Sequence, residues 1–446
     1  MMFVEDWLGL LIASKTWAWL SAIVENAMAF AGLVRNYVKN LRERSLLHQS
    51  AIKMRARLEL IRQRRNKAFW EGVERRWGKP IEVGIILTLV LMPVLNSWGT
   101  LLVLTLLLLI IRSPGKKPRD TGLFIFWLAL VISALMAVGI GGFGRLATVT
   151  IWLLLAGLTG RVFTAEFSRK VIRFSVIAGL IWMVIGLWQQ VVGVSTPAHW
   201  LEQGQSLFIS VRSYSVFGNP NIYGLYLVSI LCFAFAGTKS GEGIYPAVSW
   251  VVLVLALVSL FFTYSRTAWL LSLLGLILWS GKGFVARKRF IFLWWGLFLM
   301  IPGFKARIGG LSNLFESTFW FRVQIWRNMP LMIADFLWWG AGPGSFHEVY
   351  RSYLTGMAPV EHGHQLYLQL WLESGLFSLA AFFRVIAKNM AGLNRLSSIA
   401  KATALVIVLW LIAGFLETWW VHQFMGGYFW LLFGLLQSQR MEQIDS

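Results

Sequence analysis

The chain has 446 residues, of which 57% are hydrophobic and 14% are charged. Soluble domains carry roughly 25% charged residues, so this composition excludes a soluble fold. Runs such as 101–111 and 245–262 predict membrane-spanning helices. The net charge of +21 matches the Lys/Arg enrichment of cytoplasmic loops, so we expect membrane lipids as partners and no nucleic acid. The single cysteine, Cys232, excludes an internal disulfide or a thiolate metal site.

The first 80 residues are expected to form an interfacial and basic cytoplasmic region. Residues 1–34 are apolar but contain Lys15 and Glu25, which favours an amphipathic helix at the membrane interface over a span. Residues 35–79 hold 14 Lys/Arg, with apolar residues at helical spacing. This pattern is typical of a cytoplasmic helix that lies on anionic lipid.

From residue 81 the hydrophobic pattern predicts an all-α, polytopic integral membrane protein with about 12 transmembrane helices. The predicted spans cover residues 81–95, 98–111, 121–139, 146–160, 172–194, 221–237, 245–262, 267–280, 290–303, 366–383, 402–416 and 420–437. The expected domains are 1–80 (the interfacial and basic region), 81–303 (transmembrane helices 1–9), 304–365 (one large extracytoplasmic loop with short helices) and 366–446 (transmembrane helices 10–12 and a cytoplasmic tail).

The loop charges orient these spans in the membrane. Four Lys/Arg occur in each of the alternate loops 112–120, 161–173, 281–289 and 384–401. The loops 96–97, 140–145, 195–220, 263–266 and 417–420 hold none or one each, so the positive-inside rule places both termini in the cytoplasm. The long segment 304–365 has five Lys/Arg and four acids, and we expect it outside. Four residues then share the outer side, namely Arg212, Arg266, Arg322 and His364. Cations gathered on one surface of an apolar protein suit an anionic substrate.

The first candidate motif, RSYSVFGNPN, leads into the span at 221–237. The guanidinium of Arg212, beside Tyr214 at the membrane surface, offers paired donors that match a phosphate. The alternative is an interface arginine whose head group reaches water. Asn219 and Asn221 can cap the helix that begins here or contact the substrate.

The second motif, FFTYSRTAW, joins two spans by a very short turn that contains Arg266. A charge at the centre of a bilayer costs ~2.5–3.5 kcal/mol on insertion scales, and less near the interface. Arg266 therefore needs a partner. We favour a ligand anion, with Glu417 on the same side as the structural alternative.

The third motif is FWFRVQIWR, followed by WGAGPGSF. The spacing of Phe319, Val323 and Trp326 predicts a short amphipathic helix that docks on the membrane face and carries Arg322. The glycine run lacks the Gly-Lys-Ser/Thr ending of a phosphate loop. We interpret it as a turn.

The fourth motif, EHGHQLYLQLWLESGL, opens the span at 366–383 with two histidines. Their spacing alone is weak evidence for zinc because no third ligand is apparent nearby, so no metal or other cofactor is predicted. Histidines can take a proton from a sugar hydroxyl at neutral pH, and His364, at the span entrance beside Gln365, is the candidate base. Glu361 and Glu373 are possible orienting acids.

At these four motifs the sequence resembles the O-antigen ligase and polymerase superfamily of bacterial envelope glycosyltransferases. The matching stretches are RSYSVFGNPNIYGLYL, TYSRTAWL, FRVQIW with GAGPGSF, and HGHQLYLQLWLESGLFSL. The resemblance implies a GT-C-like fold in the cytoplasmic (inner) membrane with an active site that faces the periplasm or exterior. It implies metal-independent, inverting transfer of a glycan from undecaprenyl diphosphate to an acceptor hydroxyl on a glycan, a lipid such as lipopolysaccharide core, or a protein.

The resemblance implies catalytic roles for Arg212, Arg266 and His364, and a basic residue at Arg322. The remaining substrate-binding candidates in the motifs are Tyr214, Asn219, Asn221 and Gln365. The family more often has His-Asn where this chain has His-Gln, which leaves the role of Gln365 open. A polymerase of the same chemistry is an alternative. A further one is an inorganic-anion transporter, because one branch of the superfamily is labelled as putative bicarbonate transporters.

Overall fold

The computed structural model describes residues 84–94 without 86, 103, 121–137, 142–197, 211–240, 246–280, 296, 318–353, 360–390 and 396–445, all within the compact unit Arg75–Ser446. These residues form helices and connecting turns, and no strand occurs among them. The all-α prediction is confirmed for this part of the chain. The predicted helices of residues 1–80 lie outside it, as do the spans 98–111 and 290–303 apart from Val103 and Gly296.

Most of the predicted spans are observed as helices. The helices are α5 (Thr121–Met136), α6 (Gly142–Val162), α7 (Ala165–Val192), α8 (Pro220–Ser240), α9 (Pro246–Phe262), α10 (Arg266–Ser280), α13 (Thr318–Asp335), α14 (Phe346–Ser352), α15 (Leu366–Met390), α16 (Ser398–Ala413), the 3₁₀ helix η6 (Trp419–Val421) and α17 (Gln423–Asp445). Helices α5 to α10 and α15 to α17 correspond to predicted spans, although α7 begins earlier, and α15 and α17 end later, than expected. Helices α13 and α14 lie in the segment that was predicted to contain short helices.

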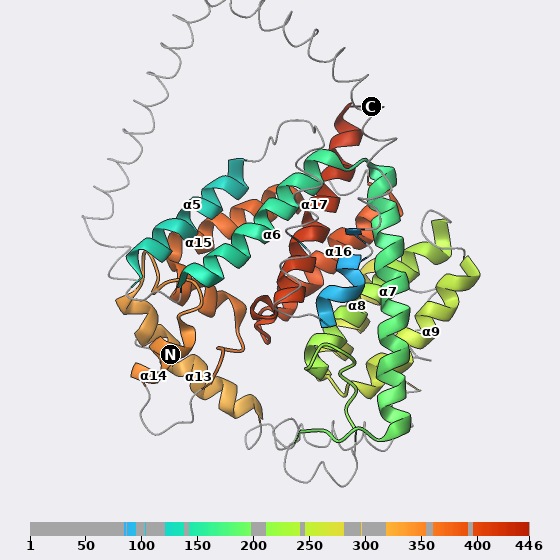
Figure 1. The fold of residues 1–446 in the computed structure, drawn as a ribbon, viewed down its shortest axis with the longest axis horizontal. Helices are drawn as coiled ribbons and strands as arrows, with labels where there is room; N and C mark the ends of the chain where they lie inside the picture. Colours follow the sequence, from blue (N-terminus) through green and yellow to red (C-terminus); the bar gives the residue numbers. More distant parts are fainter. Residues whose placement is uncertain are drawn as a thin grey trace, which may run out of the picture. The chain divides into compact units, whose positions relative to one another are not determined.

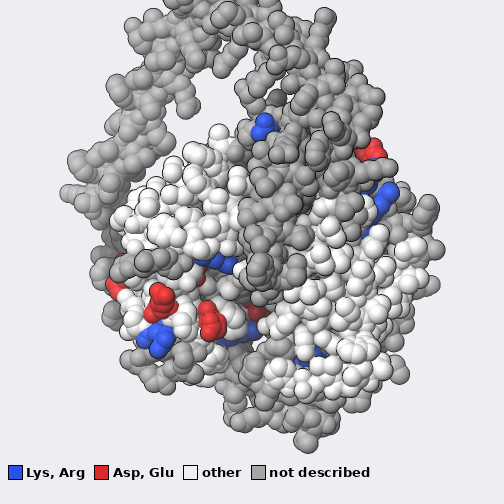
Figure 2. Space-filling model, in the orientation of Figure 1, with Lys and Arg blue, Asp and Glu red and all other residues white. Residues whose placement is uncertain are grey.

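The composition and exposure of the helices are those of a membrane protein. Among the described helices, α6, α7, most of α8 and α15 are long and apolar enough to cross a bilayer. Val184 and Val191 of α7 are 62% and 86% exposed. Soluble proteins rarely expose large contiguous apolar patches. On the face shown in Figure 2, charged side chains are sparse over α5 and α6 and gather over α13 and α14.

Helices α16 and α17 pack against each other and against several other helices of the unit (Figure 1). Helix α17 packs along α6, while α16 contacts α8, α10 and α17. Small residues allow the close approach of α17 to α6, because a Cβ added at Gly434 would lie 2.5 Å from the carbonyl oxygen of Ala156. Helix α5 packs on α15, and α9 packs on α8.

Contacts between helix ends place the described loops in two groups, one at each end of the helices, as the charge pattern predicts. At one end, Ser168 in the first turn of α7 bonds Ser438 of α17, with 2.6 Å between their hydroxyl oxygens. At the other end, the Leu366 amide donates to the carbonyl oxygen of Gly414 over 2.7 Å. The basic loops 161–173 and 384–401 flank the first end, and the motifs that contain Arg212, Arg266, Arg322 and His364 flank the second. Which end faces the cytoplasm stays a prediction.

Helices α13 and α14 have a small hydrophobic core of their own. It consists of Ile325, Met329, Met332, Ile333, Phe346, Tyr350, Val360 and Leu372. Helix α13 packs on α15 through the face that carries Ile325 and Met329, which are fully buried. Val323 and Trp326 are half-buried, and the docking of their face on the membrane face stays a prediction. The side chain of Phe319 lies outside the described residues.

The glycine-rich segment after α13 is a turn that packs on α15. Gly340, Gly342 and Gly344 have φ values of 78°, 108° and 85°, which side chains other than glycine rarely adopt. The amide of Ala341 donates to the carbonyl oxygen of Leu372 over 2.8 Å, and the amide of Gly342 bonds the next carbonyl. The predicted turn is confirmed, and these amides face α15 instead of forming a phosphate cradle.

Helix α15 is interrupted at Gly375, which has φ 78° and ψ 172°. The Leu376 amide leaves the helical pattern and donates to the carbonyl oxygen of Leu337 over 3.0 Å. The predicted span 366–383 was continuous, so the kink is a difference from expectation. It arises from contact with the turn after α13, which no local pattern within α15 contains.

Candidate functional site

Three of the four candidate motifs contain a residue in the left-handed backbone region. Among the described residues, the non-glycine residues with positive φ are Ser215, Tyr264 and His364, at 51°, 52° and 51°. Such conformations cost on the order of 1–3 kcal/mol each and cluster at functional sites. The surrounding contacts therefore hold all three motifs in strained positions.

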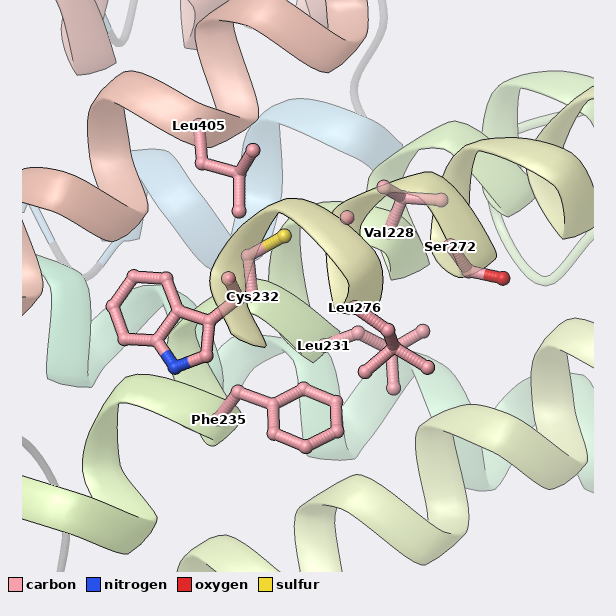
Figure 3. Close-up of a pocket in the computed structure, with 9 residues that line it drawn as sticks. Val228, Leu231, Cys232, Phe235, Ser272, Leu276 and Leu405 are labelled. Atoms are coloured by element: carbon pink, nitrogen blue, oxygen red, sulfur yellow. The ribbon is translucent and has the colours of Figure 1, made fainter. Parts of the chain in front are cut away.

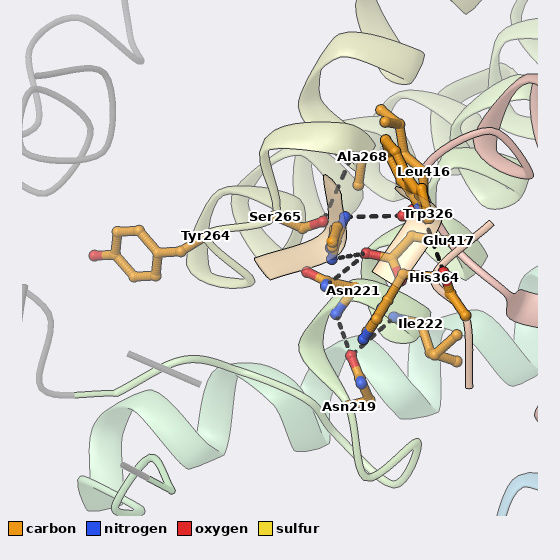
Figure 4. A network of polar contacts seen from close by, with 12 residues as sticks. Asn219, Asn221, Ile222, Tyr264, Ser265, Ala268, Trp326, His364, Leu416 and Glu417 are labelled. Carbon is orange, nitrogen blue, oxygen red and sulfur yellow. Dashed lines mark hydrogen bonds and ion pairs between the residues drawn. The ribbon is translucent and has the colours of Figure 1, made fainter. Parts of the chain in front are cut away.

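Glu417 is the centre of a polar network that joins three of the motifs (Figure 4). Its Oε1 accepts hydrogen bonds from Asn221 Nδ2 over 2.9 Å and from Arg322 Nη2 over 2.8 Å. The Nδ1 atom of His364 lies 3.9 Å from Glu417 Oε2, an ion-pair distance longer than a hydrogen bond. Glu417 thus brings α8, α13 and the start of α15 together at one end of the helices.

The charge of Glu417 is stabilised by its neighbours. Burial raises the pKa of its carboxyl group, but Arg322 and His364 oppose this effect and bring the pKa from 4.5 down to about 2. The carboxylate therefore stays ionised at neutral pH. Arg322 also donates from Nη1 to the carbonyl oxygen of Leu416 over 2.8 Å, which anchors α13 to the turn after α16.

Arg212 is buried and holds the turn that carries Arg266. It is only 5% exposed, and its Nε donates to the carbonyl oxygen of Thr263 over 3.1 Å. Its Nη2 donates to Asn221 Oδ1 over 3.3 Å. The alternative of an interface arginine with its head group in water is therefore wrong. Arg266 is the half-buried first residue of α10, two residues beyond Tyr264 of the same turn.

Asn219 and Asn221 have different roles. The Oδ1 atom of Asn219 accepts from the amides of Asn221 over 2.8 Å and Ile222 over 3.4 Å, so Asn219 caps α8. The alternative in which Asn221 is the cap is wrong, because its side chain bridges Arg212 and Glu417 instead.

Two predicted substrate-binding residues make local contacts. Gln365 Oε1 accepts a hydrogen bond from the amide of Leu368, so Gln365 caps the start of α15. The amide of Tyr214 donates to Gln189 Oε1 over 3.1 Å, and the tyrosine ring is half-buried. Both residues lie at the same end of the helices as the network, and their roles toward a substrate stay predictions.

The two histidines of the fourth motif lie side by side, with 4.3 Å between ring centroids. Burial, together with the neighbouring His364 and Arg322, lowers the pKa of His362 from 6.5 to about 4, although Glu417 opposes this. His362 is therefore neutral at pH 7. Within the described ranges, no three His, Cys, Asp or Glu side chains gather where they could hold a metal ion.

The acid beside His364 is Glu417, whereas the sequence favoured Glu361 or Glu373. Glu361 is exposed. The side chain of Glu373 is buried and accepts hydrogen bonds from Gln369 Nε2 over 2.7 Å and the Gly344 amide over 2.9 Å. The useful signal in the sequence was the position of Glu417 as an acid in an outer turn that is otherwise uncharged.

A small pocket elsewhere in the unit has a different character (Figure 3). It lies between α8, α10 and α16 and is lined by Val228, Leu231, Cys232, Phe235, Ser272, Gly275, Leu276, Trp279 and Leu405. None of these residues is charged. Unlike the Glu417 network, the pocket therefore has no positively charged side chain that could bind an anion.

Residues 251–383 match the family model described as O-antigen ligase. This match confirms the resemblance found in the motifs. It includes Arg266, Arg322 and His364, whereas Arg212 and Glu417 lie outside it. No curated protein matches the chain.

Proposed function

Because the chain contains a segment of the O-antigen ligase family, we propose that it is a GT-C-like membrane glycosyltransferase with about 12 transmembrane helices. In this proposal it transfers a glycan from undecaprenyl diphosphate to an acceptor hydroxyl at the outer face of the inner membrane. The reaction inverts the anomeric centre and is independent of metal. The family supports a role in glycan transfer or polymerisation, and the donor, acceptor and chemistry are those that the resemblance in the motifs implies.

The observation that carries the proposal is the gathering of Arg212, Arg322 and His364 around Asn221 and Glu417. These residues are far apart in the sequence and meet at one end of the helices. Two guanidinium groups and one carboxylate give this part of the network an excess of positive charge. An anionic group that enters beside it is favoured by that excess.

The arginines supply the leaving-group chemistry. As the bond between the anomeric carbon and the diphosphate oxygen breaks, negative charge develops on the diphosphate. Arg266, in the turn held by Arg212, and Arg322 stabilise this charge in a site of low dielectric constant. Cations placed where charge develops are usually the largest catalytic contribution. The proposal assigns to arginine the role that a metal ion has in many nucleotide-sugar enzymes.

His364 is the general base in this proposal. It removes the proton from the acceptor hydroxyl as the hydroxyl oxygen attacks the anomeric carbon, and undecaprenyl diphosphate leaves. The carboxylate of Glu417, 3.9 Å from His364 Nδ1, stabilises the imidazolium that forms. Asn219, Asn221, Tyr214 and Gln365 remain proposed contributors to substrate binding around these groups.

In the proposed orientation the Glu417 network lies on the outer face of the membrane. The proposed domains are residues 1–80, 81–303, 304–365 and 366–446. Labelling of single cysteines tests the orientation in a Cys232→Ser background. Glu361→Cys and Glu166→Cys form a matched pair, because both positions are exposed and they lie at opposite ends of the helices. A membrane-impermeant maleimide should label position 361 and not 166 in intact cells. The reverse pattern would overturn the outward orientation.

The activity is tested with the full chain in lipid nanodiscs. Membrane extract from the native host supplies the lipid-linked glycan, and mass spectrometry measures the release of undecaprenyl diphosphate. Wild-type protein should release it, and His364→Ala and Arg266→Ala should not, although both variants insert normally. Arg351→Ala is the matched control because Arg351 is an exposed arginine of α14. Uptake of labelled bicarbonate into vesicles without any glycan transfer would overturn the proposal in favour of a transporter.

A further inference from the structure

The backbone of Gly363, between the two histidines, is held by side chains at both of its polar groups. Its amide donates to Gln369 Oε1 over 2.9 Å, and its carbonyl oxygen accepts from Trp326 Nε1 over 2.9 Å. A Cβ added at Gly363 would lie 3.2 Å from atoms of Met329 and Phe346, so this face is also closely packed. The two peptide units that flank Gly363, the second of which leads into His364, therefore have little freedom to move.

A second contact extends this arrangement into α15. Gln369 Nε2 donates to Glu373 Oε1 over 2.7 Å, and the other carboxylate oxygen of Glu373 accepts from the Gly344 amide over 2.9 Å. Gln369 and Glu373 are four residues apart and so lie on one face of the helix. They are only 4% and 6% exposed. A continuous buried chain of hydrogen bonds thus runs from the glycine turn to Gly363.

His364 needs such support because its φ of 51° is unfavourable for a residue with a side chain. The conformation persists only where its neighbours enforce it. The backbone conformation sets the direction of the Cα–Cβ bond from which the ring extends, and His364 Nδ1 lies 3.9 Å from Glu417 Oε2. Release of the Gly363 amide would let His364 return to an ordinary conformation and turn its ring away from Glu417.

We propose that Gln369 and Glu373 are positioning residues that set the direction of the His364 imidazole through the Gly363 amide. The inference rests on the proposed function only where His364 is treated as the base. Buried polar chains are costly, and apolar side chains of similar size often stabilise a protein equally well. A polar chain buried between helices therefore favours a role beyond stability.

The chain of hydrogen bonds permits an exchange experiment. Gln369→Leu removes both bonds of Gln369, and Gln369→Glu places two carboxylates together. Both should lower kcat by about tenfold or more with little change in KM, because the base is misdirected while the substrate still binds. The double variant Gln369→Glu/Glu373→Gln can keep the three hydrogen bonds of the chain, with the middle one reversed in direction, and it retains one carboxyl group. It should recover most of the lost kcat. Glu348→Gln, at an exposed position of α14, is the control.

A second measurement needs no substrate and separates this inference from the proposed function. Diethyl pyrocarbonate modifies histidine rings, and mass spectrometry gives the rate at His364 relative to His347 in the same molecule. Gln369→Leu should raise the His364 rate by about threefold or more, since the rate follows ring exposure and nucleophilicity, and the double exchange should restore it. If wild-type protein transfers no glycan but these rates change as expected, the positioning holds and the transferase proposal fails. Unchanged rates in Gln369→Leu, or no recovery in the exchange, would overturn the positioning role.

Discussion

Arg322 Nη2 lies 2.8 Å from Glu417 Oε1, and this ion pair connects α13 to the turn between α16 and η6. The side chains are 18% and 10% exposed, so water screens the interaction only weakly. The pair therefore has two consequences. It holds α13 against the turn after α16, and it keeps the guanidinium group of Arg322 in the same network as His364.

Removal of the Glu417 charge should reduce activity strongly. Glu417→Gln keeps the shape of the side chain and leaves the half-buried Arg322 without its counter-ion, so the cost should lie below the about 3–5 kcal/mol of a fully buried pair. Some of this cost will appear as a lower melting temperature. We expect kcat to fall by about 100-fold, because the imidazolium of His364 also loses its stabilising charge. Release of undecaprenyl diphosphate measures the effect.

The double variant Glu417→Gln/Arg322→Gln is the control for this prediction. It removes both charges, so it should recover much of the melting temperature and none of the activity. Activity equal to wild type in Glu417→Gln would contradict the role of the carboxylate.

Substitution of Arg212 and substitution of Arg266 should affect stability and activity differently. Arg212 bonds the carbonyl oxygen of Thr263, so Arg212→Gln should loosen the turn and lower the melting temperature as well as the activity. Arg266→Gln should abolish transfer even where the protein remains folded, because the cation proposed to stabilise the leaving diphosphate is lost. Thermal unfolding in nanodiscs and the transfer assay separate the two effects. Equal destabilisation by both variants would argue that Arg266 is structural.

The helices and their common end could be predicted from the sequence. Runs of apolar residues locate the spans because a bilayer requires them, and loop charges group the ends because insertion depends on them. These patterns are local or additive along the chain. They are enough to assign Arg212, Arg266, Arg322 and His364 to one end of the helices, and the contacts through Asn221 and Glu417 join three of these four residues.

The pairing within the site could not be predicted in the same way. Asn219 and Asn221 are both good capping residues, and only the position of Glu417, almost 200 residues away, decides which one caps α8. The kink at Gly375 likewise depends on a contact with Leu337. A glycine in an apolar helical pattern is tolerated by an unbroken helix, so the sequence around it contains no sign of the break.

The kink at Gly375 should tolerate no side chain. Its φ of 78° alone costs an alanine on the order of 1–3 kcal/mol, and the added Cβ would meet the backbone at Trp338. Gly375→Ala should therefore lower the melting temperature and weaken activity through loss of the turn. Gly144→Ala is the matched control, because a Cβ there meets nothing within 4 Å and Gly144 lies in α6. A smaller effect for Gly375→Ala than for Gly144→Ala would contradict the packing of the kink.

The stability of the protein should fall in mildly acidic solution because of His362. Burial and the nearby cations lower its pKa from 6.5 to about 4 in the folded protein. Between these two values the unfolded chain binds a proton that the folded protein excludes. The free energy of unfolding must then decrease as the pH falls from about 6.5 to about 4. Glu417, with a pKa of about 2 against an ordinary 4.5, adds a further loss at lower pH.

The variant His362→Asn isolates the histidine contribution, since asparagine does not titrate. Melting temperatures of wild type and variant are measured from pH 7 to pH 4 in nanodiscs. The wild-type value should fall more steeply than that of the variant, because only wild type loses stability from this group. The variant should keep the decline that Glu417 causes at the acidic end. Parallel curves over the whole range would show that His362 titrates alike in the folded and unfolded chain, and would contradict its burial beside His364 and Arg322.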